Sequence, residues 1–549
     1  MNTQEILKFC LERGFLLDRE VLNLFDETND TESVKLIIER IKDSTNQRII
    51  TKKLFNQNKD KVFQIFSMLP RENQQQLEKL KIKLGFNIEI SKEFSTENKI
   101  EEKTEKETTQ SINGVKILSA FSNNHTKKLE VGDFTKYFRN RLNEMKKILQ
   151  ENSALKNLVS INKISGSRQG ISIIGIVSNK SVTKNRNMLF EIEDLTGKIR
   201  VLINANNPKV YEKAEEISLD SVLGFSGVGN REILFANEIV FPDSALPERK
   251  KSPIEEYALF LGDFHFGSRL FLEKGFLKFI DYLNRKVPNT PEVEKIKYLF
   301  IVGDIIAGVG VYPNQEKDLI LKDIEEQFIG ISQLLNKIRK DIKIIISPGN
   351  HDGVRLMEPQ PLLNEKYAWS IYDLKNVILT GNPAYVNIGA KDNFSAQNPA
   401  ETPRTPGGTT QNFSGFDVLT YHGFSFPYYA NTVPKFMTEK TLNFPDRIMA
   451  YLLKNRHLAP SHSSVQYYPS QEDNLMIKKI PDIFVSSHTH KSAVSYYNNI
   501  LMISNSSWEA KTSNQERMGN EPDFCKVPMF NLKTRTIKIL DFEDKEDEK

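Results

Sequence analysis

Cysteine is scarce in this sequence, since only Cys10 and Cys525 occur among 549 residues. Two thiols so far apart in the chain exclude a disulfide framework and a zinc ribbon. We therefore expect a reducing, intracellular compartment, in which each thiol acts as a small hydrophobic side chain. The N-terminus lacks a basic segment followed by an apolar one, so no secretory signal is expected.

Long apolar runs and a strong net charge are also missing. No stretch approaches the roughly 18 apolar residues of a membrane span, so we expect no membrane association. The most apolar segment, KYLFIVGDIIAGVGVY, contains Asp304 and three glycines and is typical of a buried strand with its loop. The net charge of +4 neither demands nor excludes a nucleic-acid partner.

Three regions with different composition precede residue 251. Apolar residues at helical spacing predict a small all-α module over residues 1–86, with either a partner-binding or a purely structural role. Residues 87–132 are rich in Glu, Lys, Thr and Ser and predict a disordered linker. Residues 133–250 begin with an amphipathic helix and continue with five short strands and a late helix. This pattern favours an OB-fold barrel, although other small barrels fit nearly as well.

Four residues of the barrel region, Arg200, Tyr211, Arg231 and Phe235, combine positive charge with aromatic rings. Such a combination could contact DNA. Packing within the barrel explains the two aromatic residues more simply.

Residues 251–549 alternate apolar strands with amphipathic helices, which predicts an α/β domain with buried strands. Within it, residues 391–415 are rich in Pro, Gly, Asn and Thr and predict a surface loop insertion. The end of the chain, residues 542–549, predicts a solvated acidic tail.

Five clusters of polar residues follow the apolar strands of this domain. They are Asp263 and His265 in LGDFHFGS, Asp304 in VGDIIAG, Asn350, His351 and Asp352 in SPGNHDG, His422 in YHG, and His488 and His490 in SHTH. Loops at the carboxyl ends of strands in an open α/β sheet converge on one crevice. Imidazole and carboxylate ligands together suit Mn, Fe or Zn better than Mg or Ca, so the five clusters predict a metal centre.

Each cluster alone is weak evidence. An aspartate after glycine usually belongs to a turn or a helix cap, and a single histidine after a strand is usually a core residue. We interpret His125, His457 and His462 in that way and assign them no metal. Five clusters that each end an apolar strand make coincidence improbable.

In this order, the clusters resemble the calcineurin-like metallophosphoesterases, whose pattern runs D-x-H, G-D, G-N-H-D, H and G-H-x-H. The match extends from residue 257 to about residue 508, with one departure, Ser487, where the family usually has glycine. Serine is small, so we expect the turn to survive. The resemblance implies a two-sheet sandwich flanked by helices that holds two divalent ions.

The resemblance also implies a role for each residue. One ion would take Asp263, His265, Asp304 and His490, and the other would take Asp304, Asn350, His422 and His488. His351 would assist the phosphate and the leaving group without binding metal, and Asp352 could orient His351. Two such ions would activate a water for in-line attack on a phosphodiester.

The superfamily contains phosphatases, nucleotidases and nucleases, so the site alone does not choose among them. The segments VGDIIAGVGVYPNQE, SPGNHDGVRLMEPQP and VSSHTHKSAVSYYNNILMISNSSWEAKTSNQ resemble the small subunits of archaeal family-D DNA polymerases. That resemblance implies a 3′–5′ exonuclease that uses manganese and proofreads for a large catalytic subunit. Its substrate would be DNA with a 3′ end, and its location would be cytoplasmic and nucleoid-associated.

Two alternatives stay open. A catalytically silent scaffold subunit would lose no activity when His351 is replaced. A stand-alone phosphatase would turn over a small phosphomonoester and would need no DNA 3′ end.

Overall fold

The computed structural model describes most of the chain after residue 127. The described residues are 3–13, 16–18, 21, 35, 38, 49–50, 111–112, 114–121, 128–394, 411–512, 515–516 and 521–544. Two compact units are present, Met1–Thr104 and Glu105–Lys549. Within the described ranges, no helix combines the length and the apolar character that crossing a membrane requires.

The N-terminal unit contains helix α1 (Thr3–Glu12), in which Ile6 and Cys10 are buried. Burial raises the pKa of the Cys10 thiol to about 11, and nearby Arg13 offsets part of that rise. Strands β1 (Leu16–Leu17) and β2 (Ile49–Ile50) pair in parallel, a pairing that the prediction of an all-α module lacks. The other residues of the predicted module lie outside the described residues.

Part of the predicted linker, residues 87–132, is a strand of the main sheet system. Strand β4 (Val115–Ala120) pairs with β14 (Ala384–Ile388) and with the short β3 (Ser111–Ile112). The linker prediction is wrong for these residues, because the polar composition of the whole segment hid the apolar VKILSA, whose Val115 is buried. Residues 87–110 lie outside the described residues.

Helix α7 (Val131–Gln150) leads into a barrel and buries Leu142, Met145 and Leu149 against its strands. The barrel elements are β5 (Gln169–Val182), β6 (Met188–Asp194), β7 (Gly197–Ile203), α8 (Pro208–Glu215), β8 (Val222–Gly229) and β9 (Ile233–Val240). The strands close in the order β5-β6-β7-β9-β8, with a parallel pair between β7 and β9. The five strands and the late helix agree with the predicted pattern, while the assignment as an OB-fold stays a prediction.

Packing within the barrel explains Tyr211 but not Phe235. Tyr211 packs against the barrel core. Phe235 is 43% exposed, and the guanidinium carbon of Arg168 lies 5.4 Å from its ring centroid. The simpler explanation is therefore wrong for Phe235, which faces solvent.

The first sheet of the α/β region has six strands in the described part of the chain, in the order β13-β12-β11-β10-β21-β22. They are β10 (Tyr257–Leu261), β11 (Ile296–Val302), β12 (Lys343–Ser347), β13 (Val377–Leu379), β21 (Lys526–Asn531) and β22 (Ile537–Asp541). Strands β10 to β13 run parallel to one another. Their carboxyl ends therefore meet at one edge of the sheet.

The second sheet has seven described strands in the order β19-β20-β18-β17-β14-β4-β3. The strands not yet introduced are β17 (Phe416–Thr420), β18 (Ile483–Ser486), β19 (Ala493–Tyr497) and β20 (Ile500–Ser504). Strands β17, β18 and β20 run parallel. The 3₁₀ turns are η1 (Ile161–Lys163), η2 (Pro291–Lys295), η3 (Gln315–Lys317) and η4 (Thr441–Asn443).

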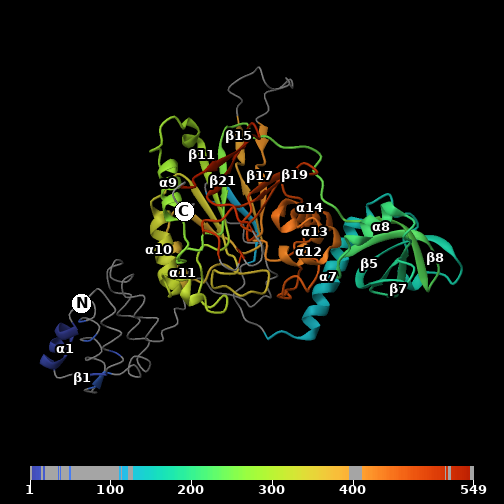
Figure 1. Cartoon of the computed structure of the whole chain (residues 1–549), viewed down its shortest axis with the longest axis horizontal. Helices are drawn as coiled ribbons and strands as arrows, with labels where there is room; N and C mark the ends of the chain where they lie inside the picture. Colours follow the sequence, from blue (N-terminus) through green and yellow to red (C-terminus); the bar gives the residue numbers. More distant parts are fainter. Residues whose placement is uncertain are drawn as a thin grey trace, which may run out of the picture. The chain divides into compact units, whose positions relative to one another are not determined.

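Helices cover the outer faces of the two sheets (Figure 1). Helices α9 (Glu273–Leu283), α10 (Ile324–Asn336) and α11 (Glu365–Tyr372) pack on the first sheet. Helices α12 (Phe426–Thr432), α13 (Pro434–Thr438) and α14 (Pro445–Asn455) pack on the second. Phe260 of β10 and Val418 of β17 belong to a third core between the sheets. This arrangement confirms the predicted α/β fold, in which the central strands are buried on both faces.

Two smaller predictions need correction. The predicted loop at 391–415 starts and ends as a hairpin of β15 (Lys391–Phe394) and β16 (Gln411–Phe413), and residues 395–410 lie outside the described residues. At the start of the predicted tail, 542–549, the ring of Phe542 packs 5.3 Å from that of Phe279. The ring of Phe542 is partly buried against α9 rather than fully solvated, and residues 545–549 lie outside the described residues.

Candidate metal centre

The predicted site residues follow five strands of the two sheets. Asp263 and His265 follow β10, Asp304 follows β11, and Asn350 and His351 follow β12; His422 follows β17, and His488 and His490 follow β18. His422 Nε2 lies 3.2 Å from Asp304 Oδ2, so the strand ends of both sheets meet. The predicted convergence is present.

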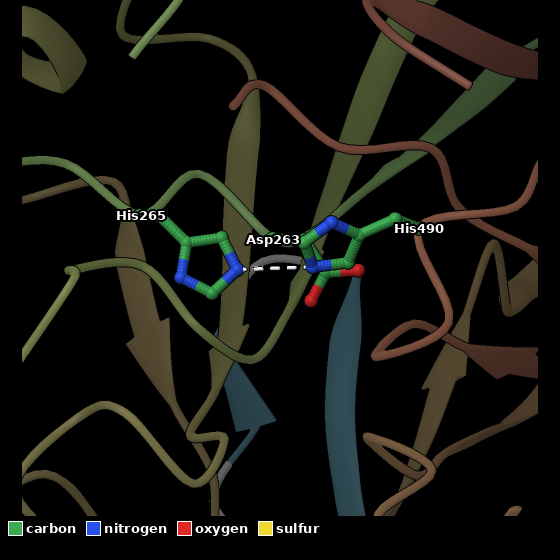
Figure 2. Close-up of side chains that lie close together, drawn as sticks. All are labelled: Asp263, His265 and His490. Carbon is green, nitrogen blue, oxygen red and sulfur yellow. Dashed lines mark hydrogen bonds between the residues drawn. The ribbon is translucent and has the colours of Figure 1, made fainter. Parts of the chain in front are cut away.

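Asp263, His265 and His490 form the first group (Figure 2). Each offers one ligand atom, and these atoms lie within 4.8 Å of one another. The Nε2 atoms of His265 and His490 face each other at 3.1 Å. Two imidazole nitrogens and a carboxylate oxygen that point into one space form a suitable donor set for a divalent transition metal.

Asp304, His422 and His488 form the second group. His422 Nε2 is 3.1 Å from Asn350 Oδ1 and 3.3 Å from His488 Nδ1. Asp304 also belongs to a group with His265 and His351. Asp304 therefore lies where the two halves of the site meet, as the resemblance implies for a shared ligand.

The backbone at this centre is unusual. Five predicted ligands adopt left-handed conformations, with φ between 49° and 69°: Asp263, His265, Asp304, His488 and His490. Such conformations cost about 1–3 kcal/mol each and are concentrated at functional sites. Neighbouring Gly349 permits the close approach of the chain, because a Cβ there would collide with the Asp304 carboxylate.

The residues present fit a divalent cation. Asp263 Oδ1 is buried without a hydrogen-bond partner, which is costly for a carboxylate oxygen. In the described part of the chain, the ion-pair partners of Asp304 are histidines, not lysine or arginine. A buried pair of carboxylates surrounded by imidazoles is therefore a site that a cation would complete.

Burial and neighbouring charges shift the pKa values of the imidazoles in opposite directions. Burial lowers the pKa of His488 to about 3 and that of His490 to about 4. Burial also opposes the charged form of His422, but Asp304 outweighs it and raises the pKa of His422 to about 10. Neutral His488 and His490 keep the lone pairs that a metal ligand needs.

His351 lies at the edge of the centre and is partly buried. Its Nδ1 is 2.7 Å from the carbonyl oxygen of Ala307, to which it can donate. Its Nε2 is 3.9 Å from Asp304 Oδ2. The ring is thus held so that Nε2 faces the site.

Asp352 does not hold the ring of His351, so the predicted orienting role is wrong. Its Oδ1 accepts hydrogen bonds from the backbone N–H groups of Ile305 (2.8 Å) and Ile306 (3.1 Å). Its Oδ2 accepts one from the N–H of Gly349 (2.7 Å). Asp352 therefore fixes the loops that follow β11 and β12.

Ser487 occupies its turn without strain, as expected. The left-handed residues of this turn are His488 and His490, so position 487 does not require glycine. Asn505 Nδ2 donates to Ser487 Oγ at 3.1 Å, which satisfies the buried hydroxyl.

Comparison with known proteins shows the family of the chain. Residues 260–495 match the family of the B subunits of DNA polymerases alpha and epsilon. The DNA polymerase II small subunit of Methanothermobacter thermautotrophicus is 33% identical over 430 residues, covering 78% of this chain and 82% of that protein. The chain belongs to the DNA polymerase II small subunit family.

The chain spans less than two thirds of the length of another relative. The DNA polymerase II small subunit of Pyrococcus furiosus is 36% identical over 419 residues, and the match covers 74% of this chain and 63% of the relative. A solved structure titled as an archaeal phosphodiesterase covers 52% of this chain and 98% of its own, with 11% identity and a TM-score of 0.24. That score is too low to bear on the fold.

Two residues near the candidate centre were missed by the sequence prediction. Glu509 is 8% exposed, and burial raises its pKa to about 7. Gln515 Nε2 lies 2.8 Å from Nδ1 of His490. Both follow β20 in a loop with no strand-end motif, so no pattern in the sequence distinguishes them.

The other histidines have structural partners or lie outside the described residues. His457 Nε2 is 2.9 Å from Asp473 Oδ2, and the His462 ring is 4.6 Å from that of Tyr467. Neither belongs to a candidate metal group in the described part of the chain. His125 lies outside the described residues.

Proposed function

We propose that this chain is the 3′–5′ exonuclease of a heteromeric archaeal DNA polymerase and hydrolyses DNA phosphodiesters at a centre of two divalent ions. The observation that carries the proposal is that candidate ligands from both sheets gather around Asp304. A protein that served only as a scaffold would have no need to keep a buried, unpaired carboxylate oxygen in such a cluster.

The chain would hold the ions with seven side chains. One ion would be bound by Asp263, His265, Asp304 and His490, and the other by Asp304, Asn350, His422 and His488. This mixture of imidazole and oxygen ligands suits manganese, iron or zinc, and the resemblance to family-D small subunits favours manganese. When bound, two divalent ions supply Lewis acidity, which activates water and neutralises charge on the phosphoryl group.

His351 is the proposed catalytic residue that does not bind metal. Because Nδ1–H can donate to the Ala307 carbonyl, Nε2 is free to hold a proton toward the site. Donation of that proton to the departing 3′ oxygen would assist cleavage. Asp352 would act as a positioning residue, since it fixes the loops that carry Asp304 and Asn350.

The proposed partners are the large polymerase subunit and DNA with a 3′ end. The name of the relatives as small subunits supports the large subunit as a partner.

For the barrel we propose the OB-fold, because the order β5-β6-β7-β9-β8 with α8 between β7 and β8 is a five-stranded Greek-key barrel. The exposed ring of Phe235 beside Arg168 gives that barrel a surface on which a base can stack. The proposed location is the cytoplasm, in association with the nucleoid.

The test is metal-dependent digestion of 5′-labelled single-stranded and mispaired DNA. We expect a ladder that shortens from the 3′ end with the wild-type chain and its loss with His351→Ala. His462→Ala is the matched control, because that histidine is exposed and lies outside the candidate groups. Equal digestion by His351→Ala would favour a scaffold or a contaminating nuclease. Turnover of a small phosphomonoester without DNA cleavage would favour a stand-alone phosphatase.

A further inference from the structure

We propose that Gln515 is a positioning residue that sets which ring nitrogen of His490 carries the proton, and so controls the binding of one of the two ions. The inference rests on the proposed metal centre. It concerns the first group only, formed by Asp263, His265 and His490.

The loop that carries Gln515 already holds this group at several points. Its described residues, 505–512, 515–516 and 521–525, lie between β20 and β21 in the chain. The N–H of Trp508 and the hydroxyl of Ser507 both donate to the carbonyl oxygen of Asp263, at 2.9 and 3.0 Å. The N–H of Asp523 donates to the carbonyl oxygen of His490 at 2.8 Å. The loop therefore supports the backbone of two residues of the first group.

Gln515 adds a contact to the ring of His490 itself. Its side-chain Nε2 lies 2.8 Å from His490 Nδ1. Its Oε1 accepts from the N–H of Thr512 at 3.0 Å, and the N–H of Gln515 donates to the Thr512 hydroxyl at 3.2 Å. This reciprocal pair holds the amide beside the imidazole and sets which end faces it.

The orientation of the amide determines the tautomer of His490. A neutral imidazole has one N–H, so the nitrogen that accepts from Gln515 leaves the proton on the other. With the amide NH₂ toward Nδ1, the proton lies on Nε2, which faces His265 Nε2 at 3.1 Å. That Nε2–H can donate to His265 but cannot bind a metal.

Rotation of the amide by 180° reverses this arrangement. Gln515 Oε1 would then accept from Nδ1–H, and Nε2 of His490 would offer its lone pair to the ion. A ligating histidine commonly donates its other N–H in this way. Gln515 can supply both states because an amide carries a donor and an acceptor. Binding of the first ion is thereby coupled to the contact between Gln515 and Thr512.

The effect is selective. Within the described part of the chain, the side chain of Gln515 hydrogen-bonds His490 and Thr512, neither of which belongs to the second group. Loss of Gln515 should therefore weaken the binding of the ion in the first group and leave the binding of the other ion unchanged. A general loss of folding would weaken both.

The experiment measures Mn²⁺ binding to the metal-free full chain by isothermal titration calorimetry. Gln515→Leu removes the acceptor and should lower the affinity for one of the two ions about 10- to 100-fold. Gln515→Glu keeps an acceptor for Nδ1–H and should bind both ions at least as tightly as the wild-type chain. Gln471→Leu is the matched control, because Gln471 is exposed and lies outside both groups. The unfolding temperature of each metal-free variant checks that it is folded.

Each outcome bears on the inference. The inference is wrong if Gln515→Leu binds both ions with wild-type affinity, or if this variant binds both ions more weakly. It is also wrong if Gln515→Glu binds the ion of the first group more weakly than the wild-type chain. If the wild-type chain binds no Mn²⁺ and leaves DNA intact, the proposed function itself fails. If the wild-type chain binds two ions and Gln515→Leu behaves like it, only the role of Gln515 fails.

Discussion

The strained ligands of the candidate centre are held by their backbone neighbours. Asp263 and Asp304 both have positive φ. The N–H of Asp263 donates to the carbonyl of Gly303, and the carbonyl of Asp304 accepts from the N–H of His265. These bonds, together with the carboxylate of Asp352, hold the two residues in a conformation that is costly for an isolated chain.

We predict that Asp352→Asn lowers the free energy of unfolding and weakens metal binding at the centre. Asparagine has one acceptor oxygen, whereas Asp352 receives N–H bonds on both oxygens. One buried backbone donor would therefore lose its acceptor, which costs about 1–3 kcal/mol. The measurement is the free energy of unfolding in urea together with Mn²⁺ affinity. Asp281→Asn, at a half-exposed position paired with Lys286, should change stability by less than about 0.5 kcal/mol. Equal stability of the two variants would contradict the role given to Asp352.

Helix α7 is the element that joins the barrel to the α/β region. Its Arg141 Nε donates to Asp473 Oδ2 at 2.6 Å, and its Tyr137 hydroxyl donates to the other oxygen at 2.5 Å. The side chains of Arg141 and Asp473 are almost fully buried. Arg141 also donates to the carbonyl of Pro460. The burial of a matched charge pair ties this helix to the sheet region at one defined position.

Arg141→Met is expected to destabilise the α/β unit strongly. Removal of one partner leaves the Asp473 charge buried without its cation, which costs about 3–5 kcal/mol. Arg139→Met is the control on the same helix, because Arg139 is exposed and should change the unfolding free energy by about 0.5 kcal/mol or less. Chemical denaturation of both variants measures the difference. A small effect of Arg141→Met would mean that the pair does not hold α7.

His457 in the same cluster predicts how stability depends on pH. It is satisfied as a neutral ring, because Nδ1 accepts from the N–H of Ala459 and Nε2 can donate to Asp473. Burial, then the charge of Arg141, lowers the pKa of His457 to about 4. The unfolded state, with a pKa near 6.5, therefore takes up a proton first as the pH falls.

The contribution of His457 to the free energy of unfolding is complete above about pH 6.5 and is lost as the pH falls toward 4. Between pH 7 and pH 5 the loss should be about 2 kcal/mol. Unfolding in urea at several pH values measures it, and His457→Gln, which cannot take up a proton, should show a flatter dependence by that amount. An identical slope for the two proteins would mean that folding does not shift the pKa of His457.

For the whole molecule, prediction from the sequence succeeded where local pattern determines position. Asp304 lies at a strand end, as the pattern indicates, because it comes just after the buried strand β11, whose parallel neighbours bring their ends to the same edge. Prediction failed where a contact depends on distant packing. The strand Val115–Ala120 pairs with β14, more than 260 residues later, and Gln515 reaches His490 from a loop without a motif. No local composition encodes either contact.

The centre also joins the two sheets, which gives the last prediction. Asp304 comes from the first sheet and His422 from the second, and their side chains meet at 3.2 Å. A cation bound by both would stabilise the folded chain by mass action, since the unfolded chain lacks the site. At a concentration of 100 times Kd the gain is about 2.7 kcal/mol for one ion, which corresponds to a rise in Tm of about 3 °C in a unit of this size. Calorimetry with Mn²⁺ and then with EDTA should show the rise and its reversal. Asp304→Asn should abolish the rise and His462→Ala should retain it; an unchanged Tm in the wild-type chain would mean that these side chains do not share a metal.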